Sequence, residues 1–175
     1  MAPSSYQGPR VETKVQGSAS QDARIAFEHA YSQATVGDLL EEKGISLFSV
    51  TKSMSLLAVS AELTARQIGN LPVVNANGGL VGVISERDII KAVAEAGDKA
   101  LKMSAEDFMT ANPKKCVRGD KIVDVMKIMS DGHFRHMPVV DGDRLEGVIS
   151  IRDIVMHRVK EVEFEALRLK QLVVG

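Results

Sequence analysis

The chain has 175 residues, of which 45% are hydrophobic and 26% are charged. This composition is that of a globular chain with one domain or two small ones, and it excludes fibrous and wholly disordered proteins. The 22 lysines and arginines nearly balance the 23 aspartates and glutamates, so no overall basic field attracts a nucleic-acid backbone. The single cysteine, Cys116, cannot form an intrachain disulfide, which favours a reducing compartment.

The N-terminal part of the chain shows no pattern of a targeting sequence. Residues 1–20 are rich in Ser, Gly, Gln and Pro without periodicity and predict a flexible lead, and residues 21–34 predict a short helix over Asp22–Tyr31. No apolar run approaches the ~20 residues that a membrane span needs, and the start lacks the apolar core of a signal peptide. We therefore expect a cytoplasmic protein without a membrane partner.

An internal repeat organises the rest of the chain. The strings LVGVISERDII (80–90) and LEGVISIRDIV (145–155) are identical at eight of eleven positions, and each follows a PVV string, at 72–74 and 138–140. NANGG and DGDR separate the two apolar runs of each copy, and Gly beside Asn or Asp between β-branched runs predicts a hairpin. A helix is then expected to begin at Ser85 and at Ser150.

Each copy also has an earlier part. Short apolar elements at 48–51 and 115–117 precede helices whose apolar faces run from Leu56 to Leu63 and from Ile122 to Met129. The order strand, helix, strand, strand, helix thus occurs twice, with 95–105 as the connection. Two such half-sheets are expected to pair about a pseudo-twofold axis. The predicted fold class is α/β in the broad sense of a mixed fold of helices and strands, and more narrowly α+β.

The C-terminal segment predicts a long amphipathic helix. Its apolar stripe extends beyond what the second copy can cover, which predicts burial against a second subunit in a homodimer. The stripe consists of Val155, Val159, Val162, Ala166, Leu169 and Val173.

The repeated GVISxRDI with its preceding PVV resembles the tandem cystathionine β-synthase (CBS) domain pair, or Bateman module. The likeness covers about residues 35–155 and is strongest to small stand-alone bacterial proteins made of one pair. It implies a first repeat at 35–98, a second repeat at 99–158 and a C-terminal helix at 159–175. The resemblance also implies a disc-like homodimer that binds adenosyl ligands in clefts between the repeats and is not itself catalytic.

Two Ser–Asp pairs stand where a strand ends and a helix begins, at Ser85 with Asp88 and at Ser150 with Asp153. Such a pair can simply cap a helix, a contribution of ~1 kcal/mol. A helix N-terminus also offers N–H groups to phosphate, and a carboxylate can accept hydrogen bonds from vicinal ribose hydroxyls. The resemblance favours the ligand role, above all for the second pair.

Arg135 and His136 precede the second PVV strand, and the resemblance implies that they contact a nucleotide phosphate. The first copy has Gly69 and Asn70 instead, so the second cleft is expected to be the better anion site. A solvated Arg beside a His that caps a strand end is the alternative.

Further nucleotide contacts follow from the resemblance. Arg87 and Arg152 lie in the first turn of a helix, where the helix dipole is unfavourable for a cation and a bound anion would offset this effect. Arg152 departs from the family, in which Gly is common at this position. Its side chain either contacts the phosphate or fills the cleft. The resemblance also implies that backbone and apolar groups at the starts of the strands surround the adenine. These residues are Cys116, Val117, Val50, Leu71, Met137 and Pro138.

Three functions are weighed. The first is a non-enzymatic regulatory module, sensing energy or redox state, that binds AMP or else ADP, ATP or NAD(H) and signals to a protein that the sequence does not identify. The second is a ligand-free dimeric adaptor. The third, an enzyme using His136 as an acid or base, ranks last because no second catalytic group, catalytic cofactor or metal-ligand spacing accompanies it.

Overall fold

The structure is a computed structural model that describes residues 33–44 and 47–174. The predicted lead and the predicted helix over Asp22–Tyr31 lie outside these residues. The order strand, helix, strand, strand, helix is confirmed in the first repeat. Its elements are β1 (Val50–Thr51), α3 (Leu56–Arg66), β2 (Asn70–Val74), β3 (Leu80–Ser85) and α4 (Glu86–Ala96).

The second repeat follows the same order with one difference. The predicted strand at 115–117 is reduced to a single parallel bridge between Cys116 and Val139. The apolar helix and the hairpin are present as predicted, and the helix after the GVIS string starts directly behind Ser150. The elements are α6 (Ile122–Asp131), β5 (His136–Asp141), β6 (Arg144–Ser150) and α7 (Ile151–Val174).

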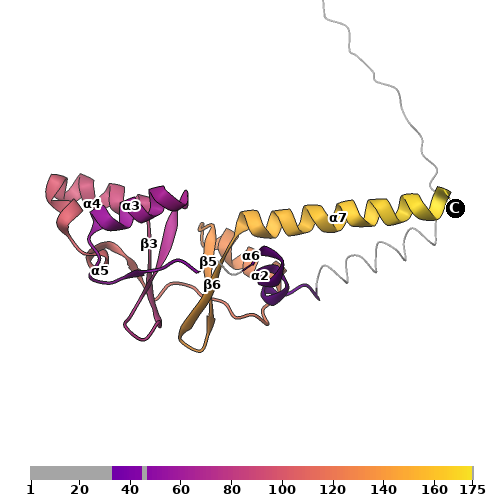
Figure 1. The fold of residues 1–175 in the computed structure, drawn as a ribbon, viewed down its shortest axis with the longest axis horizontal. Coiled ribbons are helices and arrows are strands. Elements are labelled where there is room, and N and C mark those ends of the chain that lie inside the picture. Colours follow the sequence, from indigo (N-terminus) through magenta and orange to yellow (C-terminus); the bar gives the residue numbers. More distant parts are fainter. Residues whose placement is uncertain (1–32, 45–46, 175) are drawn as a thin grey trace, which may run out of the picture.

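Both predicted hairpins form, and their turns join the two repeats. Gly78 and Gly142 have φ angles of 77° and 57°, a conformation that glycine adopts without a steric penalty. The turns pair with each other, since Leu80 N donates to Asp143 O at 2.9 Å and Leu145 N donates to Gly78 O at 3.3 Å. Figure 1 shows the hairpins side by side, with their turns on one side and α3, α4 and α7 on the other.

The connection between the repeats has more structure than the sequence predicted. It forms a 3₁₀ segment (Gly97–Lys102), α5 (Ala105–Phe108) and β4 (Thr110–Ala111). Strand β4 pairs antiparallel with β3, which gives the sheet order β1-β2-β3-β4. Ala100 and Ala105 are buried in the core of the first repeat. The segment leading into the second repeat therefore completes the first one.

Helix α2 (Val36–Lys43) was missed by the sequence analysis. It precedes the first repeat in the chain but packs in the core of the second repeat. Val36, Leu39 and Leu40 are buried in the core of the second repeat, and Figure 1 shows α2 beside α6 and β6. Thr35 and Asp38 cap this helix, because Thr35 N and Oγ1 both donate to Asp38 Oδ2, at 2.8 and 2.7 Å. The core of each repeat thus depends on the helix that precedes the other repeat.

Helix α7 is continuous from the second repeat into the C-terminal segment. Its first half packs on α2 and α6, and the rest runs past both helices (Figure 1). Ion pairs fix α2 to it, between Lys43 Nζ and Asp153 Oδ2 at 2.7 Å and between Glu42 and Lys160. Among the described helices, none has the length and hydrophobicity that crossing a membrane would require.

Candidate functional site

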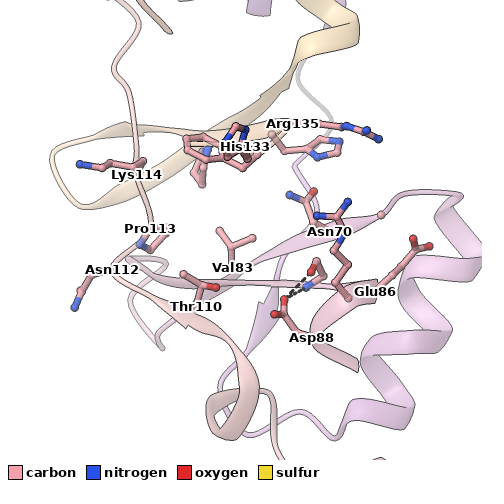
Figure 2. Close-up of a pocket in the computed structure, with 16 residues that line it drawn as sticks. Asn70, Val83, Glu86, Asp88, Thr110, Asn112, Pro113, Lys114, His133 and Arg135 are labelled. Carbon is pink, nitrogen blue, oxygen red and sulfur yellow. Dashed lines mark hydrogen bonds between the residues drawn. The ribbon is translucent and has the colours of Figure 1, made fainter. Parts of the chain in front are cut away.

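A cavity of about 610 Å³ lies between the two repeats (Figure 2). Its size falls within the range of about 300–1,000 Å³ typical of small-molecule sites. The first repeat contributes the start of β2, the end of β3 and the first turn of α4. The segment 110–114 and the turn that leads into β5 close it. The lining residues are Gly69, Asn70, Val83, Ser85, Glu86, Arg87, Asp88, Thr110, Asn112, Pro113, Lys114, His133, Phe134, Arg135, His136 and Pro138.

Asp88 provides a carboxylate on the first-repeat side of the cavity. Its Oδ2 atom accepts hydrogen bonds from Ser85 N at 2.8 Å and from Ser85 Oγ at 2.6 Å. No donor in the described part of the chain reaches its other oxygen, Oδ1. The same carboxylate can therefore cap α4 and still accept a hydrogen bond from a ligand hydroxyl.

Basic side chains line the cavity from several directions. Figure 2 shows His133 and Arg135 across the cavity from Asp88, and Lys114 at one end. Arg87 adds a third permanent cation, against the two carboxylates of Glu86 and Asp88. The permanent charges alone, three cations and two carboxylates, give the lining an excess of positive charge, which suits an anionic ligand.

His136 is half-buried at the start of β5. Burial lowers the pKa of its imidazole, the neighbouring cations Lys43 and Arg135 lower it further, and Asp153 opposes them. His136 is therefore neutral near pH 7, when one ring nitrogen donates and the other accepts a hydrogen bond. In register, His136 pairs with Ser150 as Asn70 pairs with Ser85, which confirms the alignment of the two copies.

Asp153 occupies the position in the second repeat that Asp88 has in the first, but its surroundings differ. Asp153 Oδ2 accepts from Ser150 N at 2.8 Å, and Lys43 Nζ of α2 donates to the same oxygen at 2.7 Å. Lys43 also donates to Val148 O at 3.2 Å. The carboxylate of the second repeat is thus engaged by a cation of the chain itself.

The remaining predicted site residues do not line the cavity around Asp88. Val50, Leu71 and Met137 are buried in the two cores, while Val117 and Arg152 are exposed on the surface. Cys116 is also buried, and burial, with a smaller contribution from Asp120, raises the pKa of its thiol to about 12. Ser85, Arg87, Asp88, Arg135, His136 and Pro138 are the predicted residues that the cavity brings together.

Comparison with known proteins identifies the fold. The family model for the CBS domain matches residues 35–95 and again 105–160. The chain belongs to the CBS-domain family.

Solved CBS structures resemble the whole pair. A CBS-domain containing protein from Agrobacterium tumefaciens, ATU1752, is 38% identical, with a TM-score of 0.67 over 71% of this chain and 99% of that one. CBSX2 in complex with AMP is 25% identical, with a TM-score of 0.63 over 72% and 97% of the two chains. The CBS pair of MJ0100, in complex with 5′-methylthioadenosine and S-adenosylmethionine, is 27% identical, with a TM-score of 0.62 over 73% and 98%.

The chain spans only part of some relatives. It covers 65% of the length of a 17.7 kDa protein from Acidianus ambivalens, to which it is 29% identical, and 41% of the longer MJ1225 from Methanocaldococcus jannaschii, to which it is 28% identical. This chain therefore corresponds to only a part of each of these two proteins.

Several lining residues of this CBS pair escaped the sequence analysis. Thr110, Asn112 and Lys114 belong to the segment between the predicted connection (95–105) and the predicted strand (115–117), for which the sequence analysis made no prediction. His133 has a φ angle of 55° in the turn after α6, at the position that Gln67 occupies after α3 with a φ of 54°. Thr110, Asn112 and Lys114 reach the cavity because β4 pairs with β3, and no local sequence pattern indicates that pairing.

The contact between Lys43 and Asp153 predicts a pH-dependent contribution to stability. Burial acts to raise the pKa of Asp153, but hydrogen bonds from Lys43 and Ser150 outweigh it and hold the pKa below its ordinary value of 3.8. The folded state therefore gains stability from ionised Asp153 above pH 3.8 and loses it as the pH falls through the lowered pKa.

Lys43→Met is accordingly expected to lower the free energy of unfolding near neutral pH by about 1 kcal/mol or less, because Lys43 is partly exposed. The difference from wild type should shrink as the pH falls through the lowered pKa of Asp153, because protonation removes the charge that Lys43 pairs with. Urea unfolding over a series of acidic pH values measures the difference. A difference that stays the same size over the whole series would show that Lys43 does not act through the Asp153 charge.

Proposed function

We propose that this chain is a non-enzymatic regulatory module that binds an adenine nucleotide, with AMP as the first candidate, in the cavity between its CBS repeats. The observation that carries the proposal is the shape of this cavity, which places the Asp88 carboxylate opposite the basic groups of the second repeat. A carboxylate suits a ribose diol, and guanidinium and ammonium groups suit phosphate. The complexes of CBSX2 with AMP and of MJ0100 with adenosyl compounds support an adenosyl ligand.

In this arrangement Asp88 accepts hydrogen bonds from the ribose hydroxyls through the oxygen that Ser85 leaves free. Arg87, Lys114 and Arg135 attract the phosphate, and neutral His136 supplements them as a hydrogen-bond donor. Apolar lining groups, among them Val83, Pro113 and Pro138, offer contact area to the base.

The positive lining favours a phosphorylated ligand over an uncharged or sulfonium-bearing adenosyl compound. A dianionic phosphate gains from three permanent cations, whereas 5′-methylthioadenosine has no charge to present to them. We therefore place AMP, ADP, ATP and NAD(H) ahead of 5′-methylthioadenosine and S-adenosylmethionine for this chain.

The first-repeat carboxylate is the better candidate for the ribose. The sequence favoured Asp153, but Lys43 Nζ donates to its Oδ2 at 2.7 Å and already compensates its negative charge. No cation in the described part of the chain pairs with Asp88, so its carboxylate is the stronger acceptor for the ribose hydroxyls. We propose that Asp88 holds the ribose, while Arg135 and His136 reach across from the second repeat.

Calorimetry with AMP and 5′-methylthioadenosine tests the proposal. AMP, with about two dozen non-hydrogen atoms at ~0.3 kcal/mol each, is expected to bind with a dissociation constant on the order of 10 μM. 5′-Methylthioadenosine should bind at least about tenfold more weakly, because it lacks the phosphate. No binding of AMP, ADP, ATP or NAD would reject the nucleotide module, and equal binding of the two compounds would reject phosphate recognition.

A ligand-free homodimeric adaptor is the second candidate, and one observation favours it. Ser104 N and Oγ donate to Asp107 Oδ2 at 2.9 and 2.7 Å, nearly the geometry of Ser85 and Asp88, although neither residue lines the cavity. Helix capping alone is therefore enough to account for the Ser–Asp pairs. The homodimer itself is common to both proposals, because α7 exposes a stripe of apolar side chains.

A further inference from the structure

Helix α7 carries an apolar stripe that no described element covers. The stripe consists of Val155, Val159, Val162, Ala166 and Leu169, and its four larger members are 41–49% exposed. The residues follow one another in steps of four, three, four and three. This spacing averages 3.5 residues, the period of a coiled-coil seam.

The stripe lies outside the side of α7 that packs on the body of the protein. Ile154, 1% exposed, and half-buried His157 and Glu161 mark the side of α7 that packs on the second repeat. Successive residues turn by roughly 100° around a helix, so the stripe lies about a third of a turn from that side. It can receive another helix without displacing α2 or α6.

We propose that the α7 helices of two copies pair along this stripe as a parallel, in-register, two-stranded coiled coil. Val159 and Ala166 take the a positions of the heptad, and Val155, Val162 and Leu169 take the d positions. Val159 at a and Leu169 at d match the pattern, a β-branched residue at a with Leu at d, that favours two strands. The inference rests on the proposed homodimer and does not depend on the ligand.

The charges that flank the stripe fit the parallel direction. In a parallel pair, each g residue lies beside the e residue five positions further along the other helix. Glu165 at g then meets Lys170 of the second copy. One heptad earlier, Arg158, which also pairs with Glu161 in its own helix, meets Glu163. Both contacts join opposite charges.

The antiparallel direction is disfavoured by the same residues. The antiparallel register that buries the stripe places Val159 opposite Leu169 and Val162 opposite Ala166. It then brings Glu163 of one helix against Glu163 of the other, and Glu165 against Glu165. Two contacts between like charges replace the favourable ones.

Disulfide trapping in the full chain tests the pairing directly. In the parallel coiled coil Val162 faces its own copy, so Val162→Cys should form a disulfide-linked dimer under mild oxidation. Phe164→Cys, at a position 64% exposed but directed away from the seam, is the matched control and should remain unlinked. The native Cys116 adds no background, because it is buried and its thiol has a pKa of about 12.

The outcomes separate this inference from the homodimer. A dimer in sedimentation that Val162→Cys fails to link, or that Phe164→Cys links equally well, would overturn the coiled coil and leave the homodimer standing. A monomer at all concentrations would overturn both. Charge reversal adds a directional readout: Glu165→Lys should weaken dimerisation on the order of tenfold, and Glu165→Lys with Lys170→Glu should restore it. No restoration would contradict the parallel register.

Discussion

Asp88→Asn should weaken AMP binding by about tenfold to a hundredfold. The substitution removes the negative charge that accepts hydrogen bonds from the ribose hydroxyls, and a hydrogen bond to a charged group contributes about 1.5–3 kcal/mol. Asn can still accept a hydrogen bond from Ser85 N, so α4 remains capped. Calorimetric titration of the variant with AMP measures the loss.

Asp107→Asn is the control for this prediction. Its carboxylate accepts the same two hydrogen bonds, from Ser104, but lies outside the cavity. It should therefore leave the AMP affinity unchanged while disturbing a helix cap to a similar degree. If both variants bind AMP as wild type does, Asp88 is a cap and the ribose contact is wrong.

Gly82→Val should lower the free energy of unfolding by about 1–3 kcal/mol, the usual cost of overpacking a core. A Cβ at this position would lie 2.4 Å from Met109 Sδ and 3.1 Å from the Thr110 carbonyl oxygen. Strand β3 has no room for a side chain at position 82, because the segment that leads into the second repeat packs directly on the strand there. Gly147 is the equivalent residue, where a Cβ would lie 3.0 Å from Leu40 Cδ2 of α2.

Further variants test whether the contact with Met109 is the reason that position 82 must be glycine. Gly119→Ala meets nothing within 4 Å and should be nearly neutral in urea unfolding. Gly82→Ala should cost less when Met109→Ala removes the side chain that it would meet, since the two residues share one contact. Equal costs of Gly82→Ala in both backgrounds would show that Met109 does not impose the glycine.

The repeat made most of the fold predictable from the sequence. The hairpins have local turn signals in Gly78 and Gly142, and the helices have apolar faces of period 3.6, so each could be found without its partner. The exchange of α2 and α5 between the repeats was not predicted. The Thr35–Asp38 pair and the spacing of Val36, Leu39 and Leu40 are helix signals that the sequence analysis overlooked, and no local signal shows which core this helix enters.

The candidate site was only partly predictable for the same reason. Asp88 and Arg135 stand in recognisable strings, whereas their meeting across one cavity depends on how the two repeats pair. Lys43 is 110 residues from Asp153 and reaches it only because α2 packs on the second repeat. The sequence therefore identified the carboxylates of Asp88 and Asp153, but not the ion pair that Lys43 forms with Asp153.

A crystal structure of the protein soaked with AMP tests the central claim most directly. The account predicts AMP in the cavity between the repeats, with its ribose hydroxyls within hydrogen-bond distance of Asp88 and its phosphate among Arg87, Lys114 and Arg135. The ion pair between Lys43 and Asp153 should remain intact. AMP bound instead at Asp153 with Lys43 displaced, or an empty cavity at saturating AMP, would contradict the account.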